Sequence, residues 1–221
     1  MDKIKTITQL DFFAQLKEEE IKELATISNL ITYPKDSILY YEDEIKENIL
    51  FLVNGLIKIY KFDKFGNEIF LYHIYKNSMI SELTSVNNSN IYCFSNAEFS
   101  EDSIVLSINF EKFKEMFLSK NILSIKLIET LLEKTHQLQC IVNRELVFDS
   151  TAKVAFMIYN DLELFNKLKR QEVSFMLHIQ PETLSRVLKK LTRNGSISIE
   201  KSDVIVLNKE QLESTFRGVG I

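Results

Sequence analysis

Two short helical patterns, separated by a break of about three residues, begin in the stretch KRQEVSFMLHIQPETLSR (169–186). Val173 and Leu177 lie at helical spacing in the first pattern. The second pattern opens at Pro181, which is favoured at a first helical position because its missing N–H would have no partner there. Two helices joined in this way predict a helix-turn-helix, whose second helix can enter the major groove of DNA.

The charge around this segment differs from that of the rest of the chain. The whole chain carries −4, whereas residues 167–201 hold eight Lys or Arg and three Glu, which gives +5 here and leaves −9 elsewhere. A basic region on an acidic protein suits a polyanion such as double-stranded DNA and makes binding depend on salt. A basic helix face that is merely solvated is the alternative interpretation of the charge alone.

The second helical pattern carries a polar triad at positions i, i+3 and i+4, formed by Glu182, Ser185 and Arg186. An Arg can contact guanine with two hydrogen bonds and a Glu can accept one from cytosine, so we expect this triad to read bases. A surface ion pair between Glu182 and Arg186 is the alternative, and both can hold. The side chains expected to contact DNA phosphates are Lys169, Thr183, Lys189, Lys190, Arg193 and Lys201.

Composition predicts a soluble, cytoplasmic protein of one or two domains. The 221 residues are 45% hydrophobic and contain neither an apolar run of 18 residues nor a signal-like N-terminus, so no membrane partner is expected. Cys93 and Cys140 are isolated and fit neither a disulfide framework nor a zinc site. With only five Gly and two Pro in the chain, the connection between domains is expected to be helical.

The first half of the chain reads as a helix followed by β-rich runs. A helix is expected over 17–30, and after Pro34 the pattern changes to short runs separated by turn signals such as Asn54-Gly55. Such runs without intervening helices predict an antiparallel barrel or roll. The runs are 37–41, 48–53, 56–62, 68–75, 90–94 and 104–108.

A long helix is expected over about 121–147, which contains no Gly or Pro. A heptad frame fits it, with an apolar stripe wider than a coiled-coil seam, so the helix should contact both a partner helix and its own β domain. A monomer that buries the whole helix is the alternative. After it, Asp149 or Ser150 is expected to cap a helix that runs through Phe165. The positions expected to form the dimer contact are Ile128, Leu131, Thr135, Leu138 and Val142.

Several segments resemble the CRP/FNR family of bacterial transcription regulators. They are FFAQLKEEEIKEL (12–24), FLVNGLIKIYKFDKFGNE (51–68), MISEL (79–83) and the helix-turn-helix stretch. The resemblance implies an α+β fold with an antiparallel jelly-roll sensor domain of the cyclic-nucleotide-binding type at 1–118, a dimerisation helix at 119–148 and a winged helix-turn-helix domain at 149–221. It also implies a homodimeric regulator, an activator that works with RNA polymerase.

The resemblance also suggests the DNA site. A twofold dimer presents its recognition helices to an inverted repeat with half-sites about one helical turn apart. The Glu-Ser-Arg triad resembles that of the FNR branch, which implies half-sites with a TTGA-like core. Two residues depart from family patterns: His178 stands at a turn position that is often Gly, and Pro181 replaces an Arg used by the cyclic-AMP branch.

The signal is not expected to be cyclic AMP. Glu82 matches the Glu that holds the ribose in cyclic-nucleotide-binding members, but no Lys, Arg or His lies between Asn77 and Glu111 to hold the phosphate. A buried phosphate without such a partner is a costly desolvated charge. Leu138 stands about where those members present a hydroxyl to the base. An iron–sulfur cluster held by four Cys is excluded because the chain has two.

Other signals stay open, and the effector is an unidentified small molecule or gas. Haem is an alternative, with His73 or His136 as axial ligand, although no cofactor and no metal are expected. Cys93 could be a nitric-oxide- or redox-reactive thiol, although a buried hydrophobe fits better. A ligand-independent regulator whose roll is only a scaffold is a further alternative. The effector pocket is expected at Glu82, Tyr92, Cys93 and His73.

A cupin-like metalloenzyme is the alternative from another functional class. It would need two or three His and a carboxylate on adjacent strands. His73 is the one His in the strand region, and the sequence shows no nucleophile–base set, so an enzyme is not expected.

Overall fold

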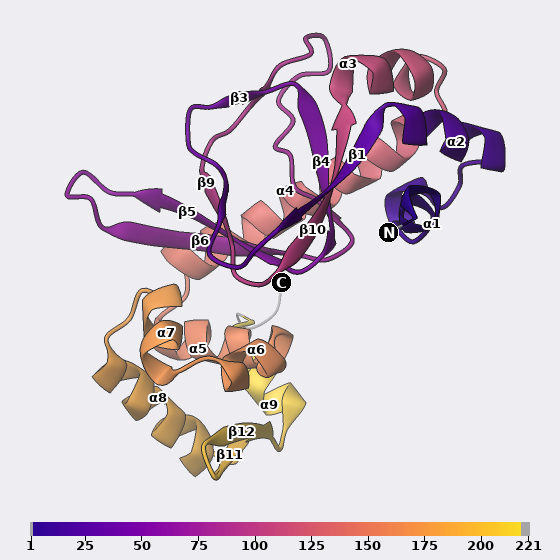
Figure 1. The fold of residues 1–221 in the computed structure, drawn as a ribbon. Coiled ribbons are helices and arrows are strands. Elements are labelled where there is room, and N and C mark those ends of the chain that lie inside the picture. Colours follow the sequence, from indigo (N-terminus) through magenta and orange to yellow (C-terminus); the bar gives the residue numbers. More distant parts are fainter. Residues whose placement is uncertain (1, 218–221) are drawn as a thin grey trace. The chain divides into compact units, whose positions relative to one another are not determined.

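The computed structural model describes residues 2–217. It divides the chain into two compact units, Met1–His136 and Gln137–Ile221. The boundary falls inside one helix, α4 (Ser124–Leu146), which corresponds to the predicted dimerisation helix (Figure 1). Over the described residues, no helix is long and apolar enough to cross a membrane.

The N-terminal segment of the first unit is helical, but the expected helix over 17–30 is too long. Helix α2 (Glu18–Thr26) stops at Thr26, and strand β1 (Ser28–Tyr33) follows directly. β1 pairs antiparallel with β10 (Ser103–Asn109) along its full length, so tertiary pairing outweighs the helical spacing of the apolar residues. Before α2 lie α1 (Lys3–Thr8) and the short helix η1 (Asp11–Phe13).

The β-roll of the first unit is built from antiparallel pairings throughout its described strands. One sheet has the order β1-β10-β4-β7, a second has the order β2-β9-β5-β6, and β3 pairs with β8. The remaining strands are β2 (Ile38–Tyr40), β3 (Ile45–Lys46), β4 (Asn48–Asn54), β5 (Leu56–Phe62), β6 (Glu68–Tyr75), β7 (Ser78–Met79), β8 (Ile91–Tyr92) and β9 (Asn96–Phe99). The predicted antiparallel roll is confirmed.

The turn between β4 and β5 requires its glycine. Gly55 has φ +105°, and a Cβ added there would lie 2.0 Å from the Ser103 hydroxyl oxygen. No L side chain fits that space, so Gly55 lets β4 approach β10 closely.

Two apolar clusters fill the first unit. One lies among the N-terminal helices, β4, β10 and the start of α4, and contains the buried rings of Phe12, Phe13, Phe51, Phe113 and Phe117. The other lies between the faces of the roll and includes Leu52, Ile59, Cys93 and Phe99. After β10 the chain passes through α3 (Phe110–Phe113) and the wider turn η2 (Lys114–Leu118) into α4.

Over its described residues, the second unit is a winged helix-turn-helix around one apolar cluster. As expected, Asp149 caps the helix after α4 by accepting a hydrogen bond from Ala152 N (2.7 Å). The expected continuous helix to Phe165 is wrong, because the chain breaks at Asp161 between α5 (Ser150–Asn160) and α6 (Leu162–Lys167). The elements that follow are α7 (Arg170–Met176), α8 (Pro181–Arg193), β11 (Ile197–Glu200), β12 (Asp203–Val206) and α9 (Lys209–Ser214).

Candidate DNA interface and candidate sensor pocket

The turn between α7 and α8 contains a residue in the left-handed conformation. His178 has φ +52°, and its N–H donates to the Phe175 carbonyl (3.1 Å) while Ile179 N donates to the Ser174 carbonyl (3.0 Å). These bonds satisfy carbonyls at the end of α7, as helix-ending turns with a left-handed residue commonly do. Gln180 then caps α8, and Pro181 occupies its first turn.

Helix α8 is sharply two-faced. Leu184, Val187, Leu188 and Leu191 are buried in the core of the unit. The opposite face holds exposed polar side chains spaced three or four residues apart, which places them in one row. Figure 1 shows α8 along the outer side of the unit, and it packs against α5 and α7. The exposed row, here called the α8 face, consists of Glu182, Ser185, Arg186, Lys189 and Arg193.

The predicted base-reading triad therefore lies on one exposed face. Within it, the Arg186 guanidinium donates to the Thr183 hydroxyl (3.1 Å). Across the described residues no ion pair joins Glu182 to Arg186, so the carboxylate does not hold the guanidinium. The neutral Thr183 hydroxyl orients the Arg186 guanidinium. The Glu182 and Arg186 side chains are both exposed to solvent.

The other predicted phosphate contacts surround the α8 face. Lys190 lies at its margin, where its ammonium donates to the Thr151 hydroxyl (3.4 Å). Lys169 is an exposed residue at the N-cap of α7 and donates its backbone N–H to Glu172 (2.6 Å). Lys201 is exposed in the turn of the β11–β12 hairpin, the wing.

Arg170, one of the eight Lys or Arg residues counted in the basic region 167–201, holds the turn of the wing. Lys201 (φ +56°) and Ser202 (φ +138°) both have positive φ, and the common two-residue hairpin turns have positive φ at one or both of these positions. The Arg170 guanidinium donates to the Ser202 carbonyl (2.7 Å) and stacks on the Phe165 ring, 4.9 Å from its centroid. Its burial lowers the pKa of Arg170. Arg170 thus fixes the wing rather than facing a ligand.

A small cavity in the β-roll contains three of the four predicted effector-pocket residues: Glu82, Tyr92 and Cys93. It offers about 10 Å³ to the centre of a water molecule, about what one water requires. The cavity is lined by Tyr40, Lys46, Leu50, Ser81, Glu82, Ile91, Tyr92 and Cys93.

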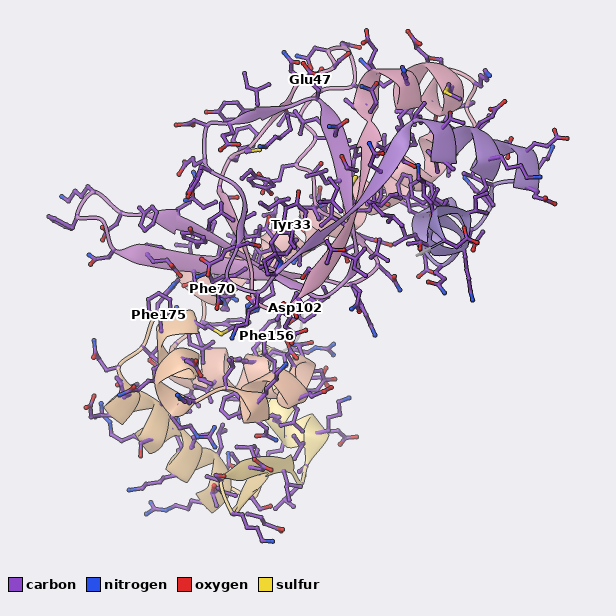
Figure 2. The ribbon with its side chains drawn as sticks, viewed as in Figure 1. Tyr33, Glu47, Phe70, Asp102, Phe156 and Phe175 are labelled. Carbon is purple, nitrogen blue, oxygen red and sulfur yellow. The ribbon has the colours of Figure 1, made fainter. Side chains whose placement is uncertain are left out.

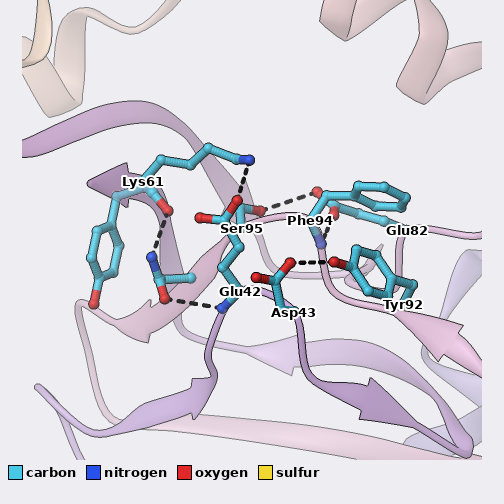
Figure 3. Close-up of polar contacts among 9 residues, drawn as sticks. Glu42, Asp43, Lys61, Glu82, Tyr92, Phe94 and Ser95 are labelled. Carbon is cyan, nitrogen blue, oxygen red and sulfur yellow. Dashed lines mark hydrogen bonds and ion pairs between the residues drawn. The ribbon is translucent and has the colours of Figure 1, made fainter. Parts of the chain in front are cut away.

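The Glu82 carboxylate is already surrounded by donors. It accepts from the Tyr72 phenol (2.9 Å), the Ser95 hydroxyl (3.4 Å) and Phe94 N (3.2 Å). Figure 3 shows the bonds from Ser95 and Phe94, and beside them the bond from the Tyr92 phenol to Asp43. Desolvation and the charge of Glu82 raise the pKa of Tyr72, so its phenol remains a donor. The sequence pattern did not indicate Tyr72 as a partner of Glu82, because only the sheet register shows which way a strand residue points.

Two cations approach this region from outside the segment 77–111. Lys46, on β3, lines the cavity and pairs with Glu44 (2.5 Å). Lys134, on α4, interacts electrostatically with Glu82, and burial lowers the pKa of Lys134 to about 8. Lys134 was missed because the heptad frame did not indicate which face of α4 meets the roll.

The thiol and imidazole candidates lie in different surroundings. Desolvation raises the pKa of Cys93 to about 11, so this thiol is protonated at neutral pH. His73 does not line the cavity; its ring lies 4.9 Å from that of Phe70 (labelled in Figure 2) and 6.2 Å from that of Tyr75. His136 is exposed on α4. Among the described residues, no group of three or more His, Cys, Asp or Glu could hold a metal ion.

Helix α4 exposes an apolar stripe whose frame differs from the predicted one. Ile128 (53% exposed) and Val142 (53%) are exposed as expected, and so is Thr135. Leu131, expected at the dimer contact, packs against the core of the β-roll, while its neighbour Leu132 is 64% exposed. Leu138 is exposed at the edge of the stripe. The exposed positions at alternating spacings of three and four residues, here called the α4 seam, are Ile125, Ile128, Leu132, Thr135, Gln139, Val142 and Leu146.

The two units match two family models. Residues 30–120 match the cyclic nucleotide-binding domain, and residues 152–215 match the Crp-like helix-turn-helix domain. A β-roll followed by a winged helix-turn-helix defines the class of sensor-linked transcription regulators. The chain belongs to the CRP/FNR family and is a DNA-binding transcription regulator. Its family and fold are those of regulators and not of enzymes.

Known proteins resemble the chain over most of its length. The anaerobic regulatory protein of Bacillus subtilis (strain 168) is 24% identical over 197 residues, which cover 84% of this chain and 82% of that protein. The structure of FixK2 from Bradyrhizobium japonicum has a TM-score of 0.64 at 19% identity and covers 88% of this chain and 100% of its own. A CooA mutant from Carboxydothermus hydrogenoformans has a TM-score of 0.68 at 14% identity, covering 87% and 89%.

Proposed function

We propose that the chain acts as a homodimer that binds an inverted-repeat DNA site through the two α8 faces. The observation that carries this proposal is the α8 face itself, where Glu182, Ser185 and Arg186 project together from a helix whose other side is buried. Lys189 and Arg193 extend the same row with positive charge that suits phosphates. Base readout comes from the triad, and the flanking cations fix its register on the duplex.

The α4 seam supports the dimer. Leu132 and Ile125, each 64% exposed, and Leu146, 81% exposed, would remain in water in a monomer. Exposed apolar side chains at alternating spacings of three and four residues are the pattern of a two-helix coiled coil. Burying one such side chain contributes about 1.5–3 kcal/mol, so several per protomer can stabilise a parallel pair of α4 helices.

The DNA half-sites are proposed to contain a TTGA-like core, because the triad resembles that of the FNR branch. Two α8 faces related by a twofold axis fit half-sites about one helical turn apart. The regulator is proposed to be an activator that works with RNA polymerase. This part rests on the resemblance to the family.

The signal is proposed to be neither cyclic AMP nor an iron–sulfur cluster. Around Glu82 the donors come from the protein itself, and the Lys46 ammonium is paired with Glu44. The protonated Cys93 thiol does not support a thiolate sensor. A second candidate, a regulator whose roll needs no ligand, is supported by a cavity little larger than one water.

A selection from random duplex DNA with the full chain tests the proposal. The expected result is an inverted repeat with a TTGA-like core in each half, bound by a species that sedimentation shows to be a dimer. Recovery of a direct repeat, or of no repeat, would contradict it. The Arg186→Ala variant, selected in parallel, should return a relaxed preference at one base pair of each half-site.

A further inference from the structure

A cluster of charges joins the end of α4 to the helix-turn-helix within the second unit. One carboxylate oxygen of Glu145 accepts from the Lys153 ammonium (2.9 Å) and lies 3.0 Å from His178 Nδ1. The other accepts from Arg144 (2.7 Å). Lys153 lies on α5 and His178 in the turn before α8. A single carboxylate therefore connects three segments of the unit.

The turn is held at two adjacent residues. Besides its bond to Glu145, the Lys153 ammonium donates to the Leu177 carbonyl (3.4 Å), and Leu177 directly precedes His178. Lys153 is 8% exposed, and a buried ammonium needs partners of this kind. Glu145 and Lys153 together thus fix the point at which the chain turns into the recognition helix.

The identity of residue 178 indicates that its side chain matters. A φ of +52° favours glycine, because other residues incur a steric penalty there. Histidine carries that penalty in this turn, and its imidazole reaches Glu145. A glycine would relax the backbone but would remove the contact to α4.

The backbone between α4 and α5 is a short connection of three residues, 147–149. Changes in the dihedral angles of such a connection can reorient the helices that it joins. The contacts of Glu145 span this connection to α5 and to the turn before α8. They hold that turn close to the last turn of α4.

We propose that Glu145, through Lys153 and His178, is a positioning residue that sets the spacing between the two DNA half-sites the dimer accepts. The inference rests on the proposed function, in which paired α4 helices carry one α8 face on each side of the twofold axis. If α8 is fixed to α4, the separation of the two α8 faces is fixed as well. If the Glu145 contacts are lost, each helix-turn-helix can pivot and accept other spacings.

The test compares His178→Gly and Glu145→Gln with wild-type protein on inverted repeats that differ only in spacer length. Full-length dimers are titrated with labelled duplexes of the selected spacer and of spacers one and two base pairs longer or shorter. Glu133→Gln is the matched control, because it removes one negative charge from an exposed site on the same helix. Melting temperatures check that every variant is folded.

We expect wild type and Glu133→Gln to bind the preferred spacer more tightly than the other spacers. In both test variants, the ratio of these affinities should fall about fivefold to tenfold. The loss should come from weaker binding at the preferred spacer, and the double variant should lose little more than either single one. His178→Gly distinguishes the two roles. If residue 178 only forms the turn, the variant should keep the affinity and the spacer preference of wild type, because glycine suits the backbone there.

Two other outcomes are distinguishable. Unchanged spacer discrimination in both folded variants would overturn the positioning role and leave the proposed function intact. A wild-type protein that bound a single half-site as tightly as the repeat would overturn the proposed function, and the positioning role with it.

Discussion

The Tyr72 phenol, on β6, donates a hydrogen bond to the carboxylate of Glu82, in the segment after β7, at 2.9 Å. Ser95 and the backbone N–H of Phe94 donate to the same carboxylate. In cyclic-nucleotide-binding members of the family the matching Glu holds a ribose, whereas this carboxylate has its donors from within the protein. A ribose would have to displace those donors. A free ligand loses translational and rotational freedom when it binds, whereas donors of the same chain are already in place.

Cyclic AMP at millimolar concentration is expected to change neither the melting temperature nor the affinity for DNA. The phosphate would find Lys46 paired with Glu44, and the cavity holds about one water. A ligand present at 100 times its dissociation constant stabilises a folded protein by about 2.7 kcal/mol, so thermal unfolding would detect binding. A saturable rise in melting temperature would contradict the prediction.

The β-roll shows where sequence patterns succeed and where they stop. Strands with continuous apolar runs, such as β4 and β5, were predicted within a residue or two. β9 was missed because it carries Asn96 and Glu98, and Asn96 is nevertheless buried with its amide on the Tyr60 carbonyl (3.3 Å). A strand that satisfies polar side chains through neighbouring strands has no apolar alternation to reveal it.

Leu132→Glu is expected to convert the dimer to a monomer, because Leu132 lies on the α4 seam and is 64% exposed. Two carboxylates facing each other across a coiled-coil seam repel and lose the apolar contact. Sedimentation measures the oligomer. Phe65→Glu is the matched control, since Phe65 is 76% exposed in the β5–β6 turn and lies outside the seam. Equal dimerisation of both variants would place the contact elsewhere.

The long helix was predictable from the absence of Gly and Pro, but the exact face of its exposed stripe was not. Ile128, Thr135 and Val142, expected at the dimer contact, are exposed, whereas Leu131 packs on its own β-roll and Leu132 is exposed in its place. The apolar stripe on α4 is wider than one coiled-coil seam, so it is compatible with two heptad frames that differ by one residue. Only the packing of the roll decides which of them faces outward.

Arg186→Ala is expected to weaken specific DNA binding by about 1–3 kcal/mol and to relax preference at one base pair per half-site. The guanidinium, steadied by Thr183, is the side chain on the α8 face best suited to read guanine. Lys189→Ala should instead weaken binding to all sequences about equally if it contacts phosphate. Anisotropy titrations on specific and random duplexes separate the two effects.

Lys120→Ala, an exposed lysine in the first unit, is the control for the loss of one positive charge. Equal losses on specific and random DNA for Arg186→Ala would show that this residue reads no base.

The polar triad of α8 could be predicted from the sequence because helical spacing defines a face. The inward orientation of the Arg170 side chain could not be predicted, because its partners, Phe165 and the Ser202 carbonyl, come close to it only in the folded unit.

Glu145→Gln is expected to destabilise the protein at neutral pH and to have progressively less effect in acid. Burial alone would raise the pKa of Glu145, but hydrogen bonds from Lys153, Arg144 and His178 lower it from 4.5 to about 2. A folded-state pKa below the unfolded one stabilises the protein above the unfolded value, and that stability is lost as pH falls from 4.5 towards 2. The difference in free energy of unfolding between wild type and Glu145→Gln should therefore be no more than about 3 kcal/mol at pH 7. It should shrink in acid, and Glu133→Gln, at an exposed site on the same helix, is the control for the loss of one negative charge. Urea unfolding at neutral and acidic pH measures both, and a difference that stayed constant down to pH 3 would show that the Glu145 charge does not stabilise the fold.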